Sequence, residues 1–246
     1  MKKIYLILPV LLILFLTSCT SAKDIETTVK DSATKASYQT TEEKYTNKDI
    51  SISYPQISGL NGSTAQNSIN QLIKTEALKG LNFFAVTDSL TLEISYKIKS
   101  ETAGILSVVY TGTGYVQGTA YPTNLFYTTN IDIKNGVKLQ LKDIVKADND
   151  LADKYLSGAF IPLDASLNSA QTSMTKEEFS QALLNADSLE KTNIEKQFFT
   201  FSYLTKDSLG ISVNVIHALG DHQEYEIKLA DIENNLLPVV SDIISN

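Results

Sequence analysis

Hydrophobic side chains alternate strictly with polar ones over residues 89–100, in the stretch SLTLEISYKIKS. The hydrophobic positions are Leu90, Leu92, Ile94, Tyr96 and Ile98. Successive side chains of a strand point to opposite faces of a sheet, so this period of two predicts a strand with one buried and one solvated face. A sheet that is solvated on one side is typically antiparallel.

A helical period precedes this strand. From Ser63 onwards the hydrophobic residues fall along one side of a helix, at Ala65, Ile69, Leu72, Ile73 and Ala77. Gly62 or Ser63 can cap the start of the helix, and Gly80 can end it. Before the helix, residues 50–54 alternate as a strand does, and Pro55 either ends that strand or places it at a sheet edge.

Further strand-like segments follow and predict a meander. They span residues 104–118, 124–133 and 137–141. Asn135-Gly136 lies between the last two segments and predicts a hairpin, because both central residues of a type I′ turn need a positive φ. Gly112 and Gly114 in the first segment indicate a bulge or close packing.

The second half of the chain predicts two helices and then more strands. Asp148 or Asn149 can cap the first helix, and the run from Thr175 to Glu178 forms a capping box for the second, which continues through Phe179. The expected strands cover residues 196–205, 209–219 and 224–232. Residues 234–246 predict a short helix broken by Pro238.

These elements predict an α+β fold with antiparallel sheets and packed helices, because strands and helices occur in separate blocks. We expect two related or contiguous subdomains, an N-terminal one over residues 49–145 and a C-terminal one over 146–246. Residues 19–48 are rich in threonine, serine, lysine and acids and have few large hydrophobic side chains. Such a composition cannot offset the entropy lost on ordering, so this segment predicts a flexible tether.

The first nineteen residues have the layout of a secretory signal. Lys2 and Lys3 are followed by a hydrophobic run over residues 4–16. That run contains Pro9 and is shorter than the roughly 20 residues that a membrane-spanning helix needs. The sequence LTSC, which ends at Cys19, resembles the bacterial lipobox.

The lipobox resemblance implies that a diacylglycerol is joined to the sulfur of Cys19 and that residues 1–18 are removed as a lipoprotein signal peptide. Two acyl chains are enough for stable attachment to a bilayer. We therefore expect a protein anchored at the extracytoplasmic face of a Gram-positive-type cell membrane. The alternative is an inert, buried cysteine in an uncleaved helix. Because Cys19 is the single cysteine, the folded part is expected to stand without disulfides.

Charge narrows the classes of partner. The precursor has a net charge of −7, and removal of the leader leaves 19 basic residues, all lysines, against 28 acidic ones, which is −9. Without arginine the chain lacks bidentate phosphate recognition, and its acidic body repels polyanions, so nucleic acid is excluded as an expected partner. An acidic surface favours cationic proteins, although it also serves simply to keep a protein soluble.

Candidate chemistry is sparse, and no cofactor is expected. His217 and His222 flank a predicted loop, and with Asp221 or Glu224 as a third ligand they form a set compatible with zinc. The alternative is that both histidines are ordinary polar residues at a hairpin tip. The sequence has no Gly-x-Ser-x-Gly elbow, no Gly-x-Gly-x-x-Gly after a strand and no phosphate loop, so we expect a protein that is not an enzyme.

Tyrosines offer candidate binding anchors because they combine a large contact area with a polar tip. The four that we single out are Tyr110, Tyr115, Tyr121 and Tyr127. The alternative is that they are half-buried strand residues, as most tyrosines in β-rich folds are.

Three stretches together carry a resemblance to a known family. They read ISYPQISGLNGSTAQNSINQLI, YTGTGYVQGTAYPTNLFYTTNIDIKNGVKLQLKDI and FFTFSYLTKDSLGISVNVIHALGDHQEYEIKLADI. Over roughly residues 45–240 the chain resembles the extracytoplasmic region of RsiV-type anti-sigma factors and the N-terminal module of PdaC-type peptidoglycan deacetylases. Many members have Gly-x-Ala-His where this chain has Gly118-Thr119-Ala120-Tyr121.

The resemblance implies an extracellular, non-enzymatic binding module for a protein, such as a lysozyme-like one, or for a cell-wall ligand such as peptidoglycan. The cytoplasmic segment and the spanning helix of the anti-sigma factors have no counterpart in the sequence, and neither does the catalytic domain of the deacetylases. One alternative function is a wall-associated hydrolase or esterase that uses His217 or His222. Another is an accessory lipoprotein that assists export or wall assembly.

Overall fold

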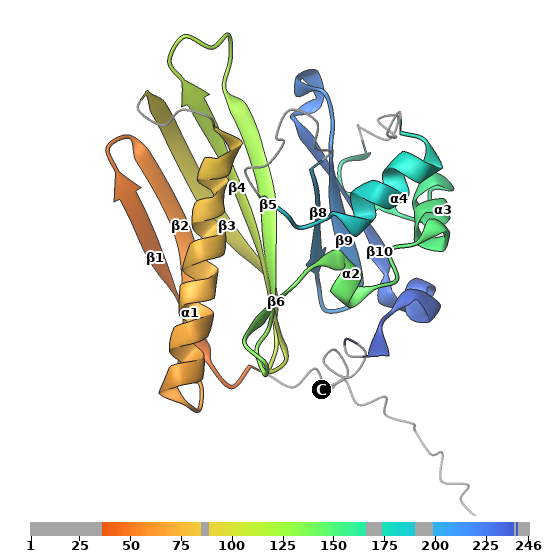
Figure 1. The fold of residues 1–246 in the computed structure, drawn as a ribbon, viewed down its shortest axis with the longest axis horizontal. Helices are drawn as coiled ribbons and strands as arrows, with labels where there is room; N and C mark the ends of the chain where they lie inside the picture. The colour runs from red at the N-terminus through yellow and green to blue at the C-terminus, as the bar shows by residue number, and fades with distance from the viewer. Residues whose placement is uncertain (1–35, 85–88, 166–173, 190–198, 239, 241–246) are drawn as a thin grey trace, which may run out of the picture. The chain divides into compact units, whose positions relative to one another are not determined.

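Across the residues that the computed structural model describes, the chain forms a six-stranded and a four-stranded sheet with helices packed against them (Figure 1). The described residues are 36–84, 89–165, 174–189, 199–238 and 240. All of them belong to one compact unit, Ser32–Asn246. The predicted α+β class is confirmed, whereas the predicted division at residue 145 stays a prediction.

The larger sheet has its strands in sequence order, β1-β2-β3-β4-β5-β6. Their bounds are β1 Gln39–Asn47, β2 Ile50–Ser58, β3 Leu90–Glu101, β4 Ile105–Val116, β5 Thr123–Asp132 and β6 Val137–Leu139. The predicted meander is confirmed for β3 to β6, but the sheet is mixed, because β2 runs parallel to β3. Parallel neighbours need a crossover connection, and helix α1 lies within it.

Helix α1 (Ser63–Leu78) confirms most of the predicted stripe, since Ile69, Ile73 and Ala77 are fully buried. Leu72 is partly buried, and Ala65 in the first turn is exposed. The hydroxyl of Tyr127 on β5 donates a hydrogen bond of 2.5 Å to the carbonyl oxygen of Ala77, which ties the helix to the sheet. Gly62 is the N-cap, with a φ of 99° that favours glycine. The helix passes at its end into a short 3₁₀ turn, η1 (Lys79–Phe83), that contains Gly80.

The predicted tether is wrong for its last part, because residues 39–47 form strand β1. Its pairing with β2 places Tyr45 opposite Ile52, and Tyr38 just before the strand is buried. The side chains of β1 are mostly exposed on both faces, so no hydrophobic alternation marks it in the sequence. Backbone pairing with β2, rather than burial, orders this segment. Residues 19–35 lie outside the described residues, as do Cys19 and the leader.

The hairpin predicted at Asn135-Gly136 is confirmed, but not its type I′ turn. Asp132 pairs with Val137, which leaves a loop of residues 133–136, and of the Asn-Gly pair only Gly136 has a positive φ, of 66°. The Asp132 carboxylate accepts hydrogen bonds from the backbone and side-chain nitrogens of Asn135 and holds the loop.

The glycines of β4 are sites of close packing, as predicted. A Cβ at Gly114 would overlap the ring of Phe84, and one at Gly112 would overlap the backbone of Glu93. The irregularity in the pairing of β3 with β4 lies elsewhere, between Ile98 and Ser100.

The smaller sheet is antiparallel and has the order β7-β10-β9-β8. Its strands are β7 Ile161–Pro162, β8 Thr200–Leu204, β9 Ser208–Asn214 and β10 His222–Lys228. The helices of this half are α2 Leu141–Ile144, α3 Asn149–Leu156 and α4 Lys176–Leu184, with 3₁₀ turns η4 His217–Leu219 and η5 Leu229–Asn235. Asp148 caps α3, and Thr175 and Glu178 form the predicted capping box of α4.

The outer strand β8 packs against the face of the larger sheet that is opposite α1. Side chains on that face form hydrogen bonds with the backbone of β8. The N–H of Leu204 donates to Ser107 Oγ at 3.0 Å. The side-chain amide of Asn130 donates to the carbonyl oxygen of Ser202 at 2.9 Å. These contacts pair backbone N–H and C=O groups at the edge of the smaller sheet, which could otherwise pair with a strand of another chain. In the described part of the chain, no helix has the length and apolar character that crossing a membrane requires.

Candidate functional site

Two hairpin tips, one from each sheet, meet at one end of the structure. The Asp221 carboxylate between β9 and β10 accepts a hydrogen bond of 2.8 Å from the backbone N–H of Asn124, at the start of β5. The same carboxylate lies 2.9 Å from Nδ1 of His217. Asp221 has a φ of 71°, and the left-handed backbone at this position turns the chain into β10. Asp221 therefore fixes the two tips relative to each other.

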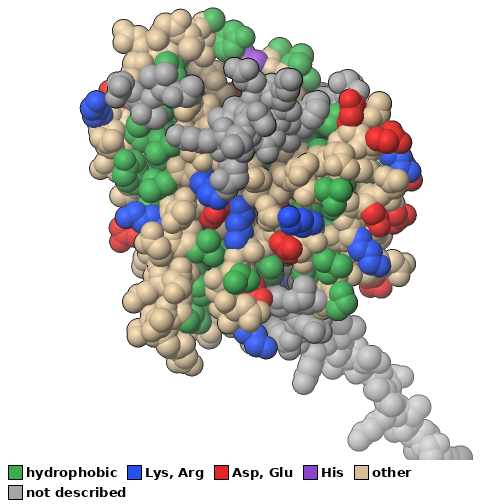
Figure 2. Space-filling view, viewed as in Figure 1, with side chains coloured by type: hydrophobic (Ala, Val, Ile, Leu, Met, Phe, Trp, Pro, Cys, Tyr) green, Lys and Arg blue, Asp and Glu red, His purple; other side chains and the backbone are tan. Residues whose placement is uncertain are grey.

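Aromatic and aliphatic side chains surround this junction. The Tyr121 ring stacks on the His217 imidazole, with centroids 4.1 Å apart and planes 11° from parallel. Exposed fractions are 58% for Tyr121, 39% for Tyr115 and 70% for Ile216. We call Tyr115, Tyr121, Ile216 and His217 the rim. Figure 2 shows a histidine flanked by hydrophobic side chains at the top of the molecule.

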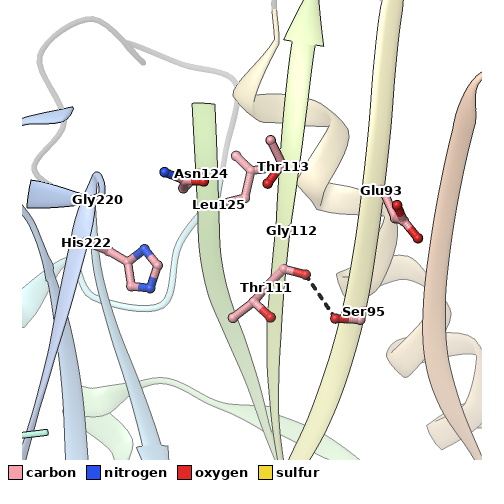
Figure 3. Close-up of a pocket in the computed structure, with 9 residues that line it drawn as sticks. All are labelled: Glu93, Ser95, Thr111, Gly112, Thr113, Asn124, Leu125, Gly220 and His222. Carbon is pink, nitrogen blue, oxygen red and sulfur yellow. Dashed lines mark hydrogen bonds between the residues drawn. The ribbon is translucent and has the colours of Figure 1, made fainter. Parts of the chain in front are cut away.

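A cavity of about 440 Å³ lies beside the rim, between the larger sheet and the start of β10 (Figure 3). Its lining consists of Glu93, Ser95, Thr111, Gly112, Thr113, Asn124, Leu125, Gly220 and His222. Most of these side chains are hydroxyls, carboxylate, amide or imidazole. The cavity therefore offers several hydrogen-bonding groups to a ligand.

His222 is the lining residue with a shifted pKa. Burial lowers the pKa of its imidazole below the usual value, and the carboxylates of Glu224 and Asp221 only partly offset this. The ring lies against Phe126, with centroids 4.9 Å apart. Its Nδ1 atom is buried and has no hydrogen-bond partner among the described residues, which agrees with an uncharged ring.

The four tyrosines predicted as anchors divide into two pairs with different roles. Tyr110 and Tyr127 are fully buried and stack on each other in the core, with centroids 4.7 Å apart. They face α1 and are not available to a ligand. Tyr115 and Tyr121 are exposed at the rim. The prediction is therefore wrong for the first pair, and for the second it stays a prediction.

The predicted zinc set of His217, His222 and Glu224 is not formed. Within the described ranges no three histidine, cysteine, aspartate or glutamate side chains lie close enough to hold a metal ion. His217 is paired with Asp221, and Glu224 forms an ion pair of 3.3 Å with Lys99. Asp221 instead links the two hairpins, because its carboxylate accepts a hydrogen bond from the backbone N–H of Asn124. The hydrolase alternative that relies on these histidines stays a prediction.

Most residues of the cavity carry no signal in the sequence. Glu93, Ser95, Thr111 and Thr113 occupy the polar positions of two alternating strands, where solvated side chains are the ordinary expectation. The spacing of two within each strand does put each pair on one face. Only the register between strands shows that the two pairs lie side by side.

Comparison with known proteins shows a likeness of fold. No family model matches the sequence, and no curated protein matches it. A crystal structure of a DUF3298 family member from Bacteroides fragilis is similar, with a TM-score of 0.50 and 14% identity over 85% of this chain and 96% of the other. A DUF3298 family protein from Pseudomonas aeruginosa matches with a TM-score of 0.43 and 10% identity over 82% and 94% of the two chains. The fold is thus similar to that of the DUF3298 family member from Bacteroides fragilis.

Proposed function

We propose that the protein is an extracytoplasmic binding module that holds a macromolecular ligand at the rim. The observation that carries the proposal is the exposure of Tyr115, Tyr121 and Ile216 where the two hairpin tips are joined by the hydrogen bond between Asp221 and Asn124. Exposed aromatic and aliphatic side chains that gather at one place mark interaction surfaces. Tyrosine is among the residues that dominate binding energy at such surfaces.

The proposal includes a lipid anchor on Cys19. It is supported by the lipobox-like LTSC sequence after a hydrophobic run of export-signal length. The anchor would place the folded part in the wall space, within reach of wall components and of proteins that arrive from outside. Labelled palmitate should enter the wild-type protein and not Cys19→Ala. Equal labelling of the wild type and the variant would contradict a lipid anchor on Cys19.

A cationic, lysozyme-like protein is the ligand that we put first. The net charge of −9 without the leader favours encounter with a basic protein, and the RsiV-type resemblance points to the same class. Tyr121 stands where many members of that family have histidine. In this chain the Tyr121 ring, stacked on His217, offers one flat face to a partner.

A pull-down tests the proposal. The immobilised chain without its leader should retain lysozyme at physiological salt. Salt screens the attraction between the opposite charges, but a complementary contact at the rim would still contribute to binding. A matched bait with Ile161→Ala, an exposed hydrophobic residue outside the rim, should retain as much. Retention that disappears entirely at modest salt would reduce the interaction to non-specific charge attraction and contradict the proposal.

A further inference from the structure

We propose that the cavity beside the rim binds a neutral, hydroxyl-rich ligand, namely a saccharide unit. A ligand in this cavity is distinct from a protein captured at the rim, and the polar groups that would bind it lie outside the rim, although Tyr121 borders both sites. It is carried by the arrangement of polar groups across three neighbouring strands.

The register of the larger sheet builds two rows across β3, β4 and β5 on the face opposite α1. In the first row Glu93 lies opposite Thr113, and Thr113 lies opposite Asn124. In the second, Ser95 lies opposite Thr111, which in turn lies opposite Phe126. Directly opposed side chains of neighbouring strands lie about 5 Å apart, so the polar members of the two rows form one polar floor, and the buried ring of Phe126 ends the second row.

The polar groups of this floor can form hydrogen bonds with the hydroxyls of a sugar. A sugar hydroxyl both donates and accepts, and so do the hydroxyls of Thr111 and Thr113 and the amide of Asn124. The Ser95 hydroxyl donates to the Thr111 carbonyl oxygen at 3.4 Å and keeps its capacity to accept (Figure 3). The carboxylate of Glu93 adds a strong acceptor. An apolar ligand would strip water from these groups without replacing the hydrogen bonds, which costs free energy.

Charge separates a neutral ligand from an anionic one. No lysine contributes to the lining of the cavity in the described part of the chain, and its one carboxylate is that of Glu93. Burial lowers the pKa of the His222 imidazole, which disfavours its cationic form. A phosphate or carboxylate ligand would therefore find no cation and would face a like charge.

Size and position agree with this assignment. A volume of about 440 Å³ lies in the range of small-ligand sites and is larger than one amino-acid side chain requires. The neighbouring Tyr121 has one ring face against His217 and is more than half exposed. That free aromatic face is placed to receive the apolar C–H face of a sugar ring that extends out of the cavity.

Saturation-transfer NMR on the full-length chain in detergent micelles tests the proposal, with N-acetylglucosamine as the neutral probe and glucuronate as the anionic one. N-acetylglucosamine should be saturated, with a dissociation constant in the millimolar range, and glucuronate should bind several-fold more weakly. Absence of saturation at tens of millimolar, or equal binding of the two probes, would overturn the proposal.

Two variants locate the site. Thr113→Val keeps the branched shape that strands favour and removes the central hydroxyl, so binding should weaken by about fivefold, as expected for one lost hydrogen bond. Glu93→Gln alters an exposed side chain and should weaken binding while leaving the melting temperature unchanged. The matched control is Thr46→Val on β1, an exposed strand threonine outside the cavity, which should bind like wild type. Wild-type binding by both cavity variants would overturn the proposal, whatever the result with lysozyme.

Discussion

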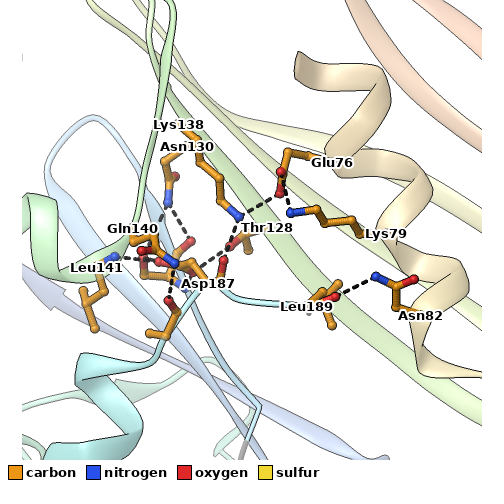
Figure 4. Close-up of polar contacts among 12 residues, drawn as sticks. Glu76, Lys79, Asn82, Thr128, Asn130, Lys138, Gln140, Leu141, Asp187 and Leu189 are labelled. Atoms are coloured by element: carbon orange, nitrogen blue, oxygen red, sulfur yellow. Dashed lines mark hydrogen bonds and ion pairs between the residues drawn. The ribbon is translucent and has the colours of Figure 1, made fainter. Parts of the chain in front are cut away.

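The carboxylate of Asp187 accepts hydrogen bonds from both the backbone N–H and the hydroxyl of Ser202, each at 2.6 Å. It also accepts from the hydroxyl of Thr128 on β5 and from the N–H of Leu141 at the start of α2 (Figure 4). One buried carboxylate thus joins strand β8, the larger sheet and a helix. Burial raises the pKa of Asp187, and its hydrogen-bond donors act in the opposite direction.

Asp187→Asn should destabilise the fold, because an amide nitrogen cannot accept the hydrogen bonds that the second carboxylate oxygen accepts. We expect a loss of about 1–3 kcal/mol in the free energy of unfolding, the usual cost of unpaired buried donors. Urea denaturation measures it. Asp207→Asn, which alters an exposed ion pair with Lys228, is the control and should have little effect. Equal stability of the two variants would contradict the role given to Asp187.

Glu76 should make stability depend on pH. Burial alone would raise the pKa of its carboxyl, but the ammonium groups of Lys138 and Lys79, at 2.7 and 2.9 Å, outweigh burial and lower it. A carboxyl with a lower pKa in the folded state contributes stability that is present above its unfolded pKa of about 4.5 and is lost as the pH falls through the folded-state pKa.

Glu76→Gln should therefore lower the free energy of unfolding by about 1–2 kcal/mol at pH 7, because the two lysines are only partly buried. The gap between the variant and wild type should close as the pH falls below that window. Urea titrations at pH 7 and in acid measure both values, with the exposed Glu43→Gln as control. A gap that stays constant with pH would contradict the ion-pair explanation.

The two pairs of tyrosines should respond differently to loss of the hydroxyl. Tyr127→Phe removes the buried bond to the Ala77 carbonyl and should cost about 1 kcal/mol of stability. Tyr121→Phe keeps the exposed ring and should leave stability unchanged. Thermal unfolding of both variants checks this, and a loss of stability in Tyr121→Phe alone would reverse the assignment of core and rim.

Gly210 lies under the ring of Tyr203, and a Cβ there would overlap that ring. Gly210→Ala should therefore destabilise the protein by about 1–3 kcal/mol through overpacking. In a Tyr203→Leu background the cost should fall, because the flat ring is gone. A double-mutant cycle measures the coupling, and additive effects of the two substitutions would rule out the contact as the cause.

Patterns in the sequence predicted those elements of the fold that depend on interactions between residues close together in the chain. The alternation of β3, the stripe of α1 and the capping box at Thr175 depend on neighbours a few residues away, and all are confirmed. Strand β1 was missed because its side chains are exposed on both faces, and only its backbone pairs with β2.

The site depends on contacts between distant segments, and that is why the sequence predicted it incompletely. The row Glu93, Thr113 and Asn124 exists only through strand register. A local signal was available for the tyrosines, since Tyr110 and Tyr115 are five residues apart on one strand and an odd separation puts them on opposite faces. That parity shows, without a structure, that Tyr110 and Tyr115 cannot contact the same ligand on one face of the sheet.

Isothermal titration of lysozyme into three forms of the leaderless chain tests most directly whether the rim binds a cationic protein. At physiological salt the wild type and Ile161→Ala should bind with equal affinity. Tyr121→Ala should bind about tenfold more weakly, as expected for loss of an aromatic anchor. No heat of binding with the wild type, or equal affinity for Tyr121→Ala, would contradict the account.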